Sequence, residues 1–201
     1  MNHSWLGPVF TVSILGAIGL ILYVNLESRP KIAPAAKVKA VAIIAASKPK
    51  GFREYPIGDE VEKNYLKIAA VWLPAIAMDG SGLGGTDVIH VEADVQATEG
   101  NPNGFGLGEF VPYLKISYSV VPAAGGEPIQ KGTLIPMVAA DGLHYGASLS
   151  MPKAGEYRLI YNIQPPSAGG LGRHSDPATG VAPWWEPFEV SFDWDYQGPP
   201  R

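Results

Sequence analysis

Apolar and polar residues alternate along much of the second half of the chain, a pattern typical of β-strands with one buried face. It is clearest in 188–196, where Phe188, Val190 and Phe192 are separated by acidic and hydroxyl residues. Seven extended runs are predicted in all: 66–73, 88–97, 113–121, 131–138, 144–151, 156–163 and 188–196. Their short, turn-rich connections predict an all-β fold, an immunoglobulin-like antiparallel β-sandwich.

The beginning of the chain has a different pattern, an uncharged and mostly apolar run from Ser4 to Leu26. Roughly 20 apolar residues are enough to cross a bilayer. Trp5 and Tyr23 lie near the two ends, where amphipathic aromatic side chains favour the membrane interface. No Lys or Arg precedes the run, and no small-residue cleavage site follows it closely. The sequence therefore predicts a retained single transmembrane helix rather than a cleaved signal peptide.

These patterns divide the chain into three segments. We expect a transmembrane anchor in 1–26, a linker rich in Pro, Ala and Lys in 27–56, and the immunoglobulin-like β-domain in 57–201. Lys and Arg follow the apolar run and do not precede it, so the positive-inside rule alone would place the domain in the cytoplasm.

Composition removes several classes of function. The formal net charge of −4 gives no electrostatic basis for binding nucleic acid. There is no Cys, which excludes disulfides and thiolate nucleophiles, and argues against blue-copper and structural zinc sites. The 24 Gly and 19 Pro residues favour short strands and turns over long helices.

Candidate metal ligands occur in three separate parts of the predicted domain. In 88–97, His90 and Glu92 share the polar face of a strand, about 6.5–7 Å apart along it, although a solvated polar face is the commoner arrangement. Met137 and His144 flank a turn that could bring them together, although Met is also a common core residue. His174 lies in a Gly-rich loop, where a histidine is usually solvated. Imidazole and thioether ligands together suit copper.

Longer motifs carry a resemblance to a known family. The segments IHVEADVQA, NPNGFGLGEFVPYLKISY, KGTLIPMVAADGLHYGA and GRHSDPATGVAPWWEPFEV resemble the periplasmic copper-binding iron-transport proteins, which act beside high-affinity iron permeases in bacteria. The similarity runs from about residue 55 to 199. It implies an immunoglobulin-like sandwich, usually dimeric, with one copper site per subunit.

The resemblance also implies a ligand set. The family's ligand positions correspond to His90, Met137, His144 and His174, and Glu92 matches a carboxylate associated with a neighbouring or alternative metal position. Asp141 could assist that carboxylate. Two departures remove potential secondary ligands: Ile135 stands where the family often has a second Met, and Ala140 where an acidic residue is common. These departures weaken the implication of iron handling more than that of copper binding.

The expected function is that of a membrane-anchored periplasmic protein that binds copper and assists iron or metal uptake or delivery. The resemblance across the whole domain outweighs the charge rule, so we expect the domain in the periplasm. Expected partners are an iron permease or another membrane-embedded complex, the bilayer through the N-terminal helix, and a second copy in a homodimer. Iron at or near the copper site is a further expectation. The alternative is an accessory structural subunit of a respiratory or photosynthetic complex that retains a copper-type site. An enzyme, such as one oxidising Fe(II) at the copper, is not expected.

Overall fold

The computed structural model describes residues 53–79 and 87–199. The predicted transmembrane run and nearly all of the predicted linker lie outside these residues. No helix within the described ranges is long and apolar enough to cross a membrane. All described residues belong to one compact unit.

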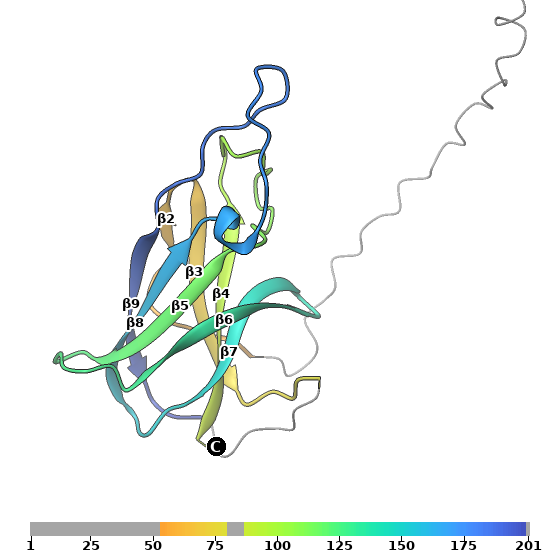
Figure 1. The fold of residues 1–201 in the computed structure, drawn as a ribbon. Helices are drawn as coiled ribbons and strands as arrows, with labels where there is room; N and C mark the ends of the chain where they lie inside the picture. Colours follow the sequence, from red (N-terminus) through yellow and green to blue (C-terminus); the bar gives the residue numbers. More distant parts are fainter. Residues whose placement is uncertain (1–52, 80–86, 200–201) are drawn as a thin grey trace, which may run out of the picture. The chain divides into compact units, whose positions relative to one another are not determined.

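The described domain is built from antiparallel strands, as predicted, with one short 3-10 helix, η1 (Pro166–Gly169) (Figure 1). The strands are β1 (Tyr55–Pro56), β2 (Val61–Lys63), β3 (Leu66–Pro74), β4 (Val88–Ala97), β5 (Lys115–Pro122), β6 (Gln130–Ala139), β7 (Gly142–Ser150), β8 (Gly155–Gln164) and β9 (Phe188–Tyr196). They form one sheet in the order β1-β3-β4-β7-β6-β5-β8-β9, with β2 also paired to β3.

One long strand makes the sheet continuous. The first half of β6 pairs with β5, and its second half, from Ile135 to Ala139, pairs with β7. The sheet curls at this strand and encloses the core between its two halves (Figure 1). Because hydrogen bonding runs without a break from β1 to β9, the two separate sheets of an immunoglobulin-like sandwich are not confirmed.

The core is contributed by one face of each strand. In β9 every second residue is buried, as the alternating sequence predicted, and Val95, Leu159 and Ile163 are among the fully enclosed side chains from other strands. All seven predicted strands are confirmed to within about two residues at each end. The two that sequence did not predict, β1 and β2, are too short to show a period. Since β1 falls within 27–56, the sheet includes the last two residues of the range assigned to the linker.

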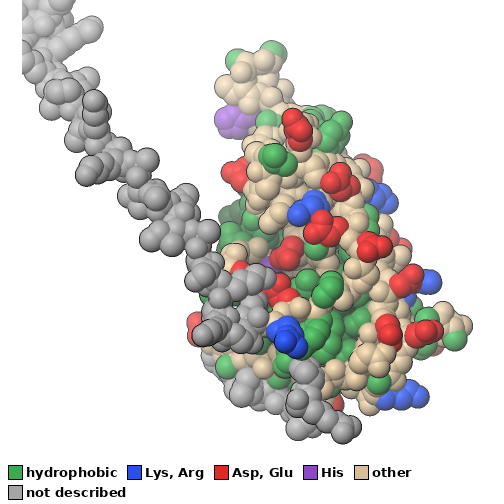
Figure 2. Space-filling model, turned by 180° about the vertical axis from the view of Figure 1, so that it is seen from behind, with side chains coloured by type: hydrophobic (Ala, Val, Ile, Leu, Met, Phe, Trp, Pro, Cys, Tyr) green, Lys and Arg blue, Asp and Glu red, His purple; other side chains and the backbone are tan. Residues whose placement is uncertain are grey.

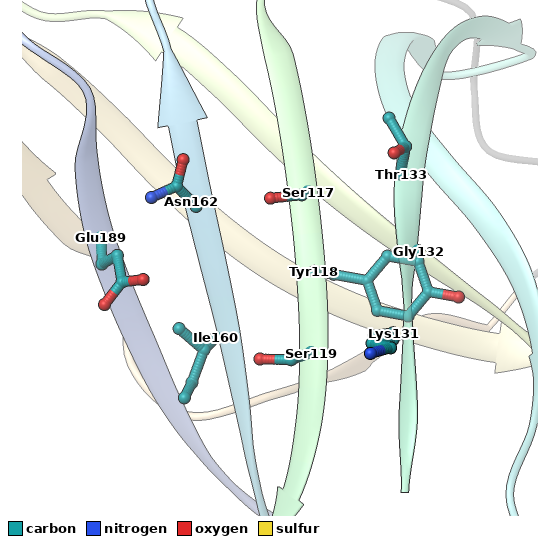
Figure 3. Close-up of a pocket in the computed structure, with 9 residues that line it drawn as sticks. All are labelled: Ser117, Tyr118, Ser119, Lys131, Gly132, Thr133, Ile160, Asn162 and Glu189. Atoms are coloured by element: carbon teal, nitrogen blue, oxygen red, sulfur yellow. The ribbon is translucent and has the colours of Figure 1, made fainter. Parts of the chain in front are cut away.

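The outer face of β5, β6, β8 and β9 is polar and carries a shallow hollow of about 380 Å³, lined by Ser117, Asn162 and Glu189 among others (Figure 3). On the opposite face of β5, Tyr118 belongs to the buried core and packs its ring over Gly132 of β6. A Cβ at Gly132 would come within 2.9 Å of that ring, so this close aromatic packing needs a glycine.

A second tyrosine ties the loop before β5 to β7. The buried Tyr145 hydroxyl donates to the Val111 carbonyl oxygen at 2.9 Å and accepts from the Leu114 amide at 2.9 Å. Tyr145 directly follows His144, so these bonds help to fix the segment of β7 that carries a predicted ligand.

Candidate metal centre

Three ionisable side chains meet on neighbouring strands β4 and β7. His90 and Glu92 are two residues apart in β4, so their side chains lie on the same face. The antiparallel register pairs Glu92 with Gly146 and His90 with Ser148. His144, two residues from Gly146, therefore reaches the same face from β7.

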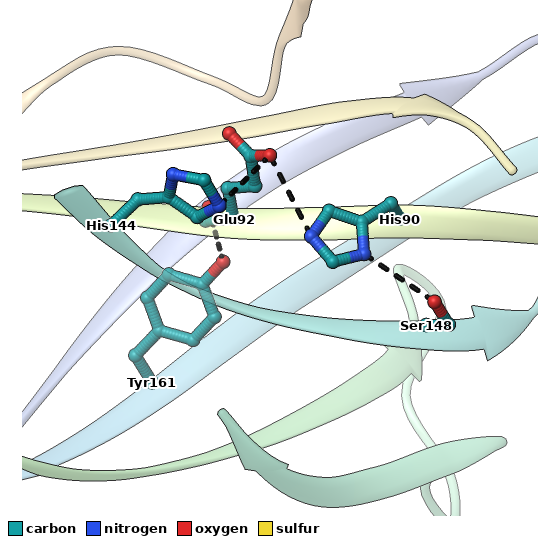
Figure 4. Close-up of polar contacts among 5 residues, drawn as sticks. All are labelled: His90, Glu92, His144, Ser148 and Tyr161. Atoms are coloured by element: carbon teal, nitrogen blue, oxygen red, sulfur yellow. Dashed lines mark hydrogen bonds and ion pairs between the residues drawn. The ribbon is translucent and has the colours of Figure 1, made fainter. Parts of the chain in front are cut away.

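The geometry is that of a compact cluster (Figure 4). The Glu92 Oε1 atom is 3.3 Å from His144 Nε2 and 3.6 Å from His90 Nε2. One ligand atom from each of the three residues lies within 4.8 Å of the others. The cluster is enclosed, because His90 is 1% exposed and Glu92 and His144 are each 4% exposed. The solvated polar face that is common for such residues is thus not what the fold forms here.

Each imidazole has a buried ring nitrogen that makes no hydrogen bond within the described residues. His90 Nε2 and His144 Nε2 have no hydrogen-bond partner among residues 53–79 and 87–199. A buried polar atom left in this state costs roughly 1–3 kcal/mol, so it calls for a specific explanation. The other His90 nitrogen, Nδ1, lies 3.4 Å from Ser148 Oγ. When Nδ1 carries the proton and donates to this hydroxyl, the Nε2 lone pair faces the cluster, as in metal-binding histidines.

Met137 belongs to the same face of the sheet. The β6–β7 turn is tighter than the sequence suggested, with only Ala140 and Asp141 outside the strands, so Met137 and His144 are direct cross-strand partners. Met137 is half-buried and is not part of the hydrophobic core. A Cβ atom added to Gly146 would lie 3.0 Å from Met137 Sδ and 2.6 Å from His90 Nε2. Two atoms at those distances from a common point are at most 5.6 Å apart.

Burial keeps both imidazoles neutral near pH 7. Desolvation, assisted by the nearby His144, lowers the pKa of His90 from 6.5 to about 4. Desolvation also lowers the pKa of His144, against the opposing effect of the Asp141 and Glu54 carboxylates and of a backbone hydrogen bond at Gly142. Since a metal binds neutral imidazole, neither ligand has to lose a proton before it can coordinate a cation.

An acidic groove adjoins the cluster at His144. It measures about 450 Å³, and its lining includes Glu54, Asp94 and Asp141. The face of the domain seen in Figure 2 carries many acidic and few basic side chains. Negative potential in a groove raises the local concentration of cations, so this surface favours the approach of a metal ion.

His174 lies apart from the other four residues within one chain. Its loop, between η1 and β9, is held by two hydrogen bonds from the Asn103 side-chain amide to the carbonyl oxygens of Ala182 and Pro183. Asn103 comes after the C-terminal end of β4, and His90 lies seven residues before that end, which is about 23 Å along the strand. The loop that carries His174 is therefore attached at the end of β4 that is distant from His90. Figure 1 shows this loop extending beyond the strands.

The His174 side chain is nevertheless oriented. Thr179 Oγ1 donates to Asp176 Oδ2 at 2.6 Å, and His174 Nδ1 lies 2.8 Å from the same hydroxyl. Because the hydroxyl proton is used on Asp176, His174 Nδ1 must be the donor in the second contact. In the neutral form of this exposed imidazole, the lone pair is therefore on Nε2.

The donors gathered on β4, β6 and β7 fit copper. Two imidazole nitrogens and a carboxylate oxygen suit Cu(II), and a thioether sulfur favours Cu(I). Sequence reasoning did not single out the groove residues Glu54 and Asp94. Asp94 continues the His90 and Glu92 periodicity, which was a usable signal, whereas Glu54 carried none.

Comparison with known proteins gives consistent matches over the described domain. Residues 51–198 match the family described as Fe2+ transport protein. The chain is 50% identical to FetP of uropathogenic E. coli strain F11, over 74% of this chain and 99% of FetP, with a TM-score of 0.69. It is 42% identical to the copper-reconstituted P19 protein from Campylobacter jejuni, over 75% of this chain and 100% of P19, with a TM-score of 0.69. A 34 kDa membrane antigen of Treponema pallidum is 34% identical over 158 residues, which are 74% of this chain and 77% of the antigen.

Proposed function

We propose that this chain, which belongs to the Fe2+ transport protein family, binds one copper ion through His90, Glu92, Met137 and His144. The observation that carries the proposal is the pair of buried imidazole Nε2 atoms that lack hydrogen-bond partners in the described domain and converge on one carboxylate oxygen. A bound cation would satisfy both nitrogens at once and remove the cost of burying them.

The relatives support copper as the metal. P19 and a variant of FetP have been solved with copper bound, at 42% and 49% identity to this chain. Copper would supply a one-electron Cu(II)/Cu(I) couple at the site. The chain's own contribution is to hold neutral imidazoles and a thioether in a largely enclosed space. We also propose that iron binds at or near this position. The groove carboxylates of Glu54, Asp94 and Asp141 offer the hard oxygen ligands that iron would need there.

We further propose that His174 acts as a ligand to the site of a second copy in a homodimer. Its loop is far from its own chain's cluster along β4, and its imidazole is exposed with the Nε2 lone pair available. Both features suit a ligand donated across an interface between copies.

The proposed role is metal binding in support of iron uptake or delivery in the periplasm, without catalysis. FetP has been produced in the E. coli periplasm, which supports that compartment. The match to FetP leaves about a quarter of this chain outside the shared domain. We propose that the apolar run in 4–26 anchors the domain to the membrane beside an iron permease or another membrane complex.

Isothermal titration of the metal-free protein with Cu(II) tests the proposal. We expect one copper per chain for the wild type, and binding weakened at least tenfold by His144→Ala. Gly155→Ala, in β8 with only ordinary contacts around the added methyl group, is the matched control and should bind as the wild type does. Absence of tight binding in the wild type, or equal affinities for the wild type and His144→Ala, would rule out the site.

A further inference from the structure

Gly146 occupies an unusual position for a glycine. It lies within β7, where it pairs with Glu92 of β4 on one side and with Ile135 of β6 on the other. A glycine inside a strand weakens it by roughly 0.5–1 kcal/mol relative to alanine, because its backbone loses more conformational freedom on folding. Some other feature must therefore favour the absence of a side chain.

Backbone conformation does not supply the reason. Gly142, in the same strand, has a φ of +142°, in the range that favours glycine, whereas the φ of Gly146 lies outside that range. Alanine could therefore adopt the Gly146 backbone without strain.

The surroundings of the Cα atom do supply a reason. A Cβ on Gly146 would lie 2.6 Å from His90 Nε2 and 3.0 Å from Met137 Sδ. At Gly132 the corresponding space is filled by a tyrosine ring, which makes the glycine a packing requirement. At Gly146 the atoms that border the space are a ring nitrogen without a hydrogen bond and a thioether sulfur, which are both metal-ligand atoms.

We propose that Gly146 is a positioning residue of the metal centre, which keeps open the space where the His90 nitrogen and the Met137 sulfur converge. This inference rests on the proposed copper function and extends it from the ligands to the residue beneath them. With any side chain at 146, the thioether and the imidazole could not both keep their places. Gly146 thus decides whether a soft sulfur ligand can join the two imidazoles and the carboxylate.

The size of the effect follows from the distances. Contacts to a real Cβ closer than 3.0 Å are essentially never seen, and ordinary contact begins at 3.4 Å. Gly146→Ala would therefore displace His90 Nε2 by about 0.8 Å and Met137 Sδ by about 0.4 Å. Binding constellations tolerate shifts of only about 0.5 Å. Disturbing the supports of metal ligands typically weakens metal binding by about 10–100-fold.

The test compares full-length wild type, Gly146→Ala and the control Gly155→Ala in competition titrations with a copper chelator. We expect Gly146→Ala to bind Cu(II) and Cu(I) at least tenfold more weakly, and Gly155→Ala to stay within twofold of wild type. In the metal-free protein, NMR should show shifted His90 imidazole and Met137 methyl resonances in Gly146→Ala, with the remaining spectrum unchanged. Unchanged resonances together with copper affinity within twofold of wild type would overturn the inference.

Failure of the wild type to bind copper and failure of Gly146→Ala to fold have different consequences for the inference. If the wild type itself fails to bind copper, the proposed function fails, while the NMR shifts still decide whether Gly146 positions the two side chains. If Gly146→Ala does not fold, Met137→Ala/Gly146→Ala is tested, because removal of the thioether gives the His90 ring room to move aside. Recovery of a folded circular dichroism spectrum supports the shared space, and an equally unfolded double variant contradicts it.

Discussion

Acidification of the metal-free protein should destabilise it through His90. This side chain is 1% exposed, and its pKa is lowered from 6.5 to about 4 by burial and by His144. Between these two pH values the unfolded chain binds a proton at this position and the folded chain does not. The free energy of unfolding must therefore fall as the pH drops from 6.5 towards 4, and above pH 6.5 the contribution is fully present.

The magnitude follows from the two pKa values of His90, 6.5 and about 4. At pH 5.0 this residue favours the unfolded state by about 2 kcal/mol relative to pH 7.5. The lowered pKa of His144 adds to the loss in the same direction. Bound copper would compete with protons for the imidazoles, so loading the protein should reduce this acid sensitivity.

Urea unfolding at pH 7.5 and 5.0, in the presence of a chelator, measures the effect. The wild type is compared with His90→Gln, which cannot titrate, and with His174→Gln, which removes an exposed imidazole instead. All titratable groups other than His90 and His174 are present in all three proteins, so the difference between His90→Gln and the wild type reports on His90 together with its coupling to His144. We expect His90→Gln to lose about 2 kcal/mol less stability than wild type on acidification, and His174→Gln to behave as wild type. Equal losses for His90→Gln and wild type would refute the reasoning.

Three further predictions concern the ligands and the support of the site. Met137→Leu should weaken Cu(I) binding by about 10–100-fold and Cu(II) binding less, because the thioether is the soft ligand. Competition with a chelator measures both affinities. A substitution that weakens Cu(I) and Cu(II) binding equally would contradict this role of Met137. Tyr145→Phe should lower the free energy of unfolding by about 1–3 kcal/mol, because the Leu114 amide and the Val111 carbonyl lose their buried hydrogen-bond partner. Urea unfolding measures this loss against the control Tyr113→Phe, in which an exposed tyrosine is changed. Equal stabilities of the two variants would contradict the prediction. His174→Ala should weaken copper binding only at protein concentrations where analytical ultracentrifugation shows self-association; the same weakening in the monomer would show that His174 does not act across an interface.

The strands could be predicted from sequence where the alternation of apolar and polar residues extends over enough positions to be recognised. β4 and β9 have the predicted bounds because ten and nine residues give several cycles of alternation. The path of the sheet was not predictable. β6 pairs with β5 through one half and with β7 through the other, and such a choice depends on the curl of the whole sheet. The transmembrane helix predicted for 4–26 lies outside the described residues and stays a prediction.

The site was predictable in its donors but not in its surroundings. Period two placed His90 and Glu92 on one face, and a hairpin was expected to bring Met137 to His144. Nothing in the local sequence showed that the polar face of β4 would be buried, because burial depends on what covers it. Glu54 is far from the groove residues in sequence and reaches them only through the fold.

Electron paramagnetic resonance of the Cu(II)-loaded protein tests the central claim most directly. The account predicts one copper per chain with hyperfine coupling to imidazole nitrogens, and loss of part of this coupling in both His90→Gln and His144→Gln. His174→Gln, measured at a concentration where the protein is monomeric, should leave the spectrum unchanged. A spectrum without nitrogen coupling, or one that neither His90→Gln nor His144→Gln alters, would show that copper is not held by the cluster on β4 and β7.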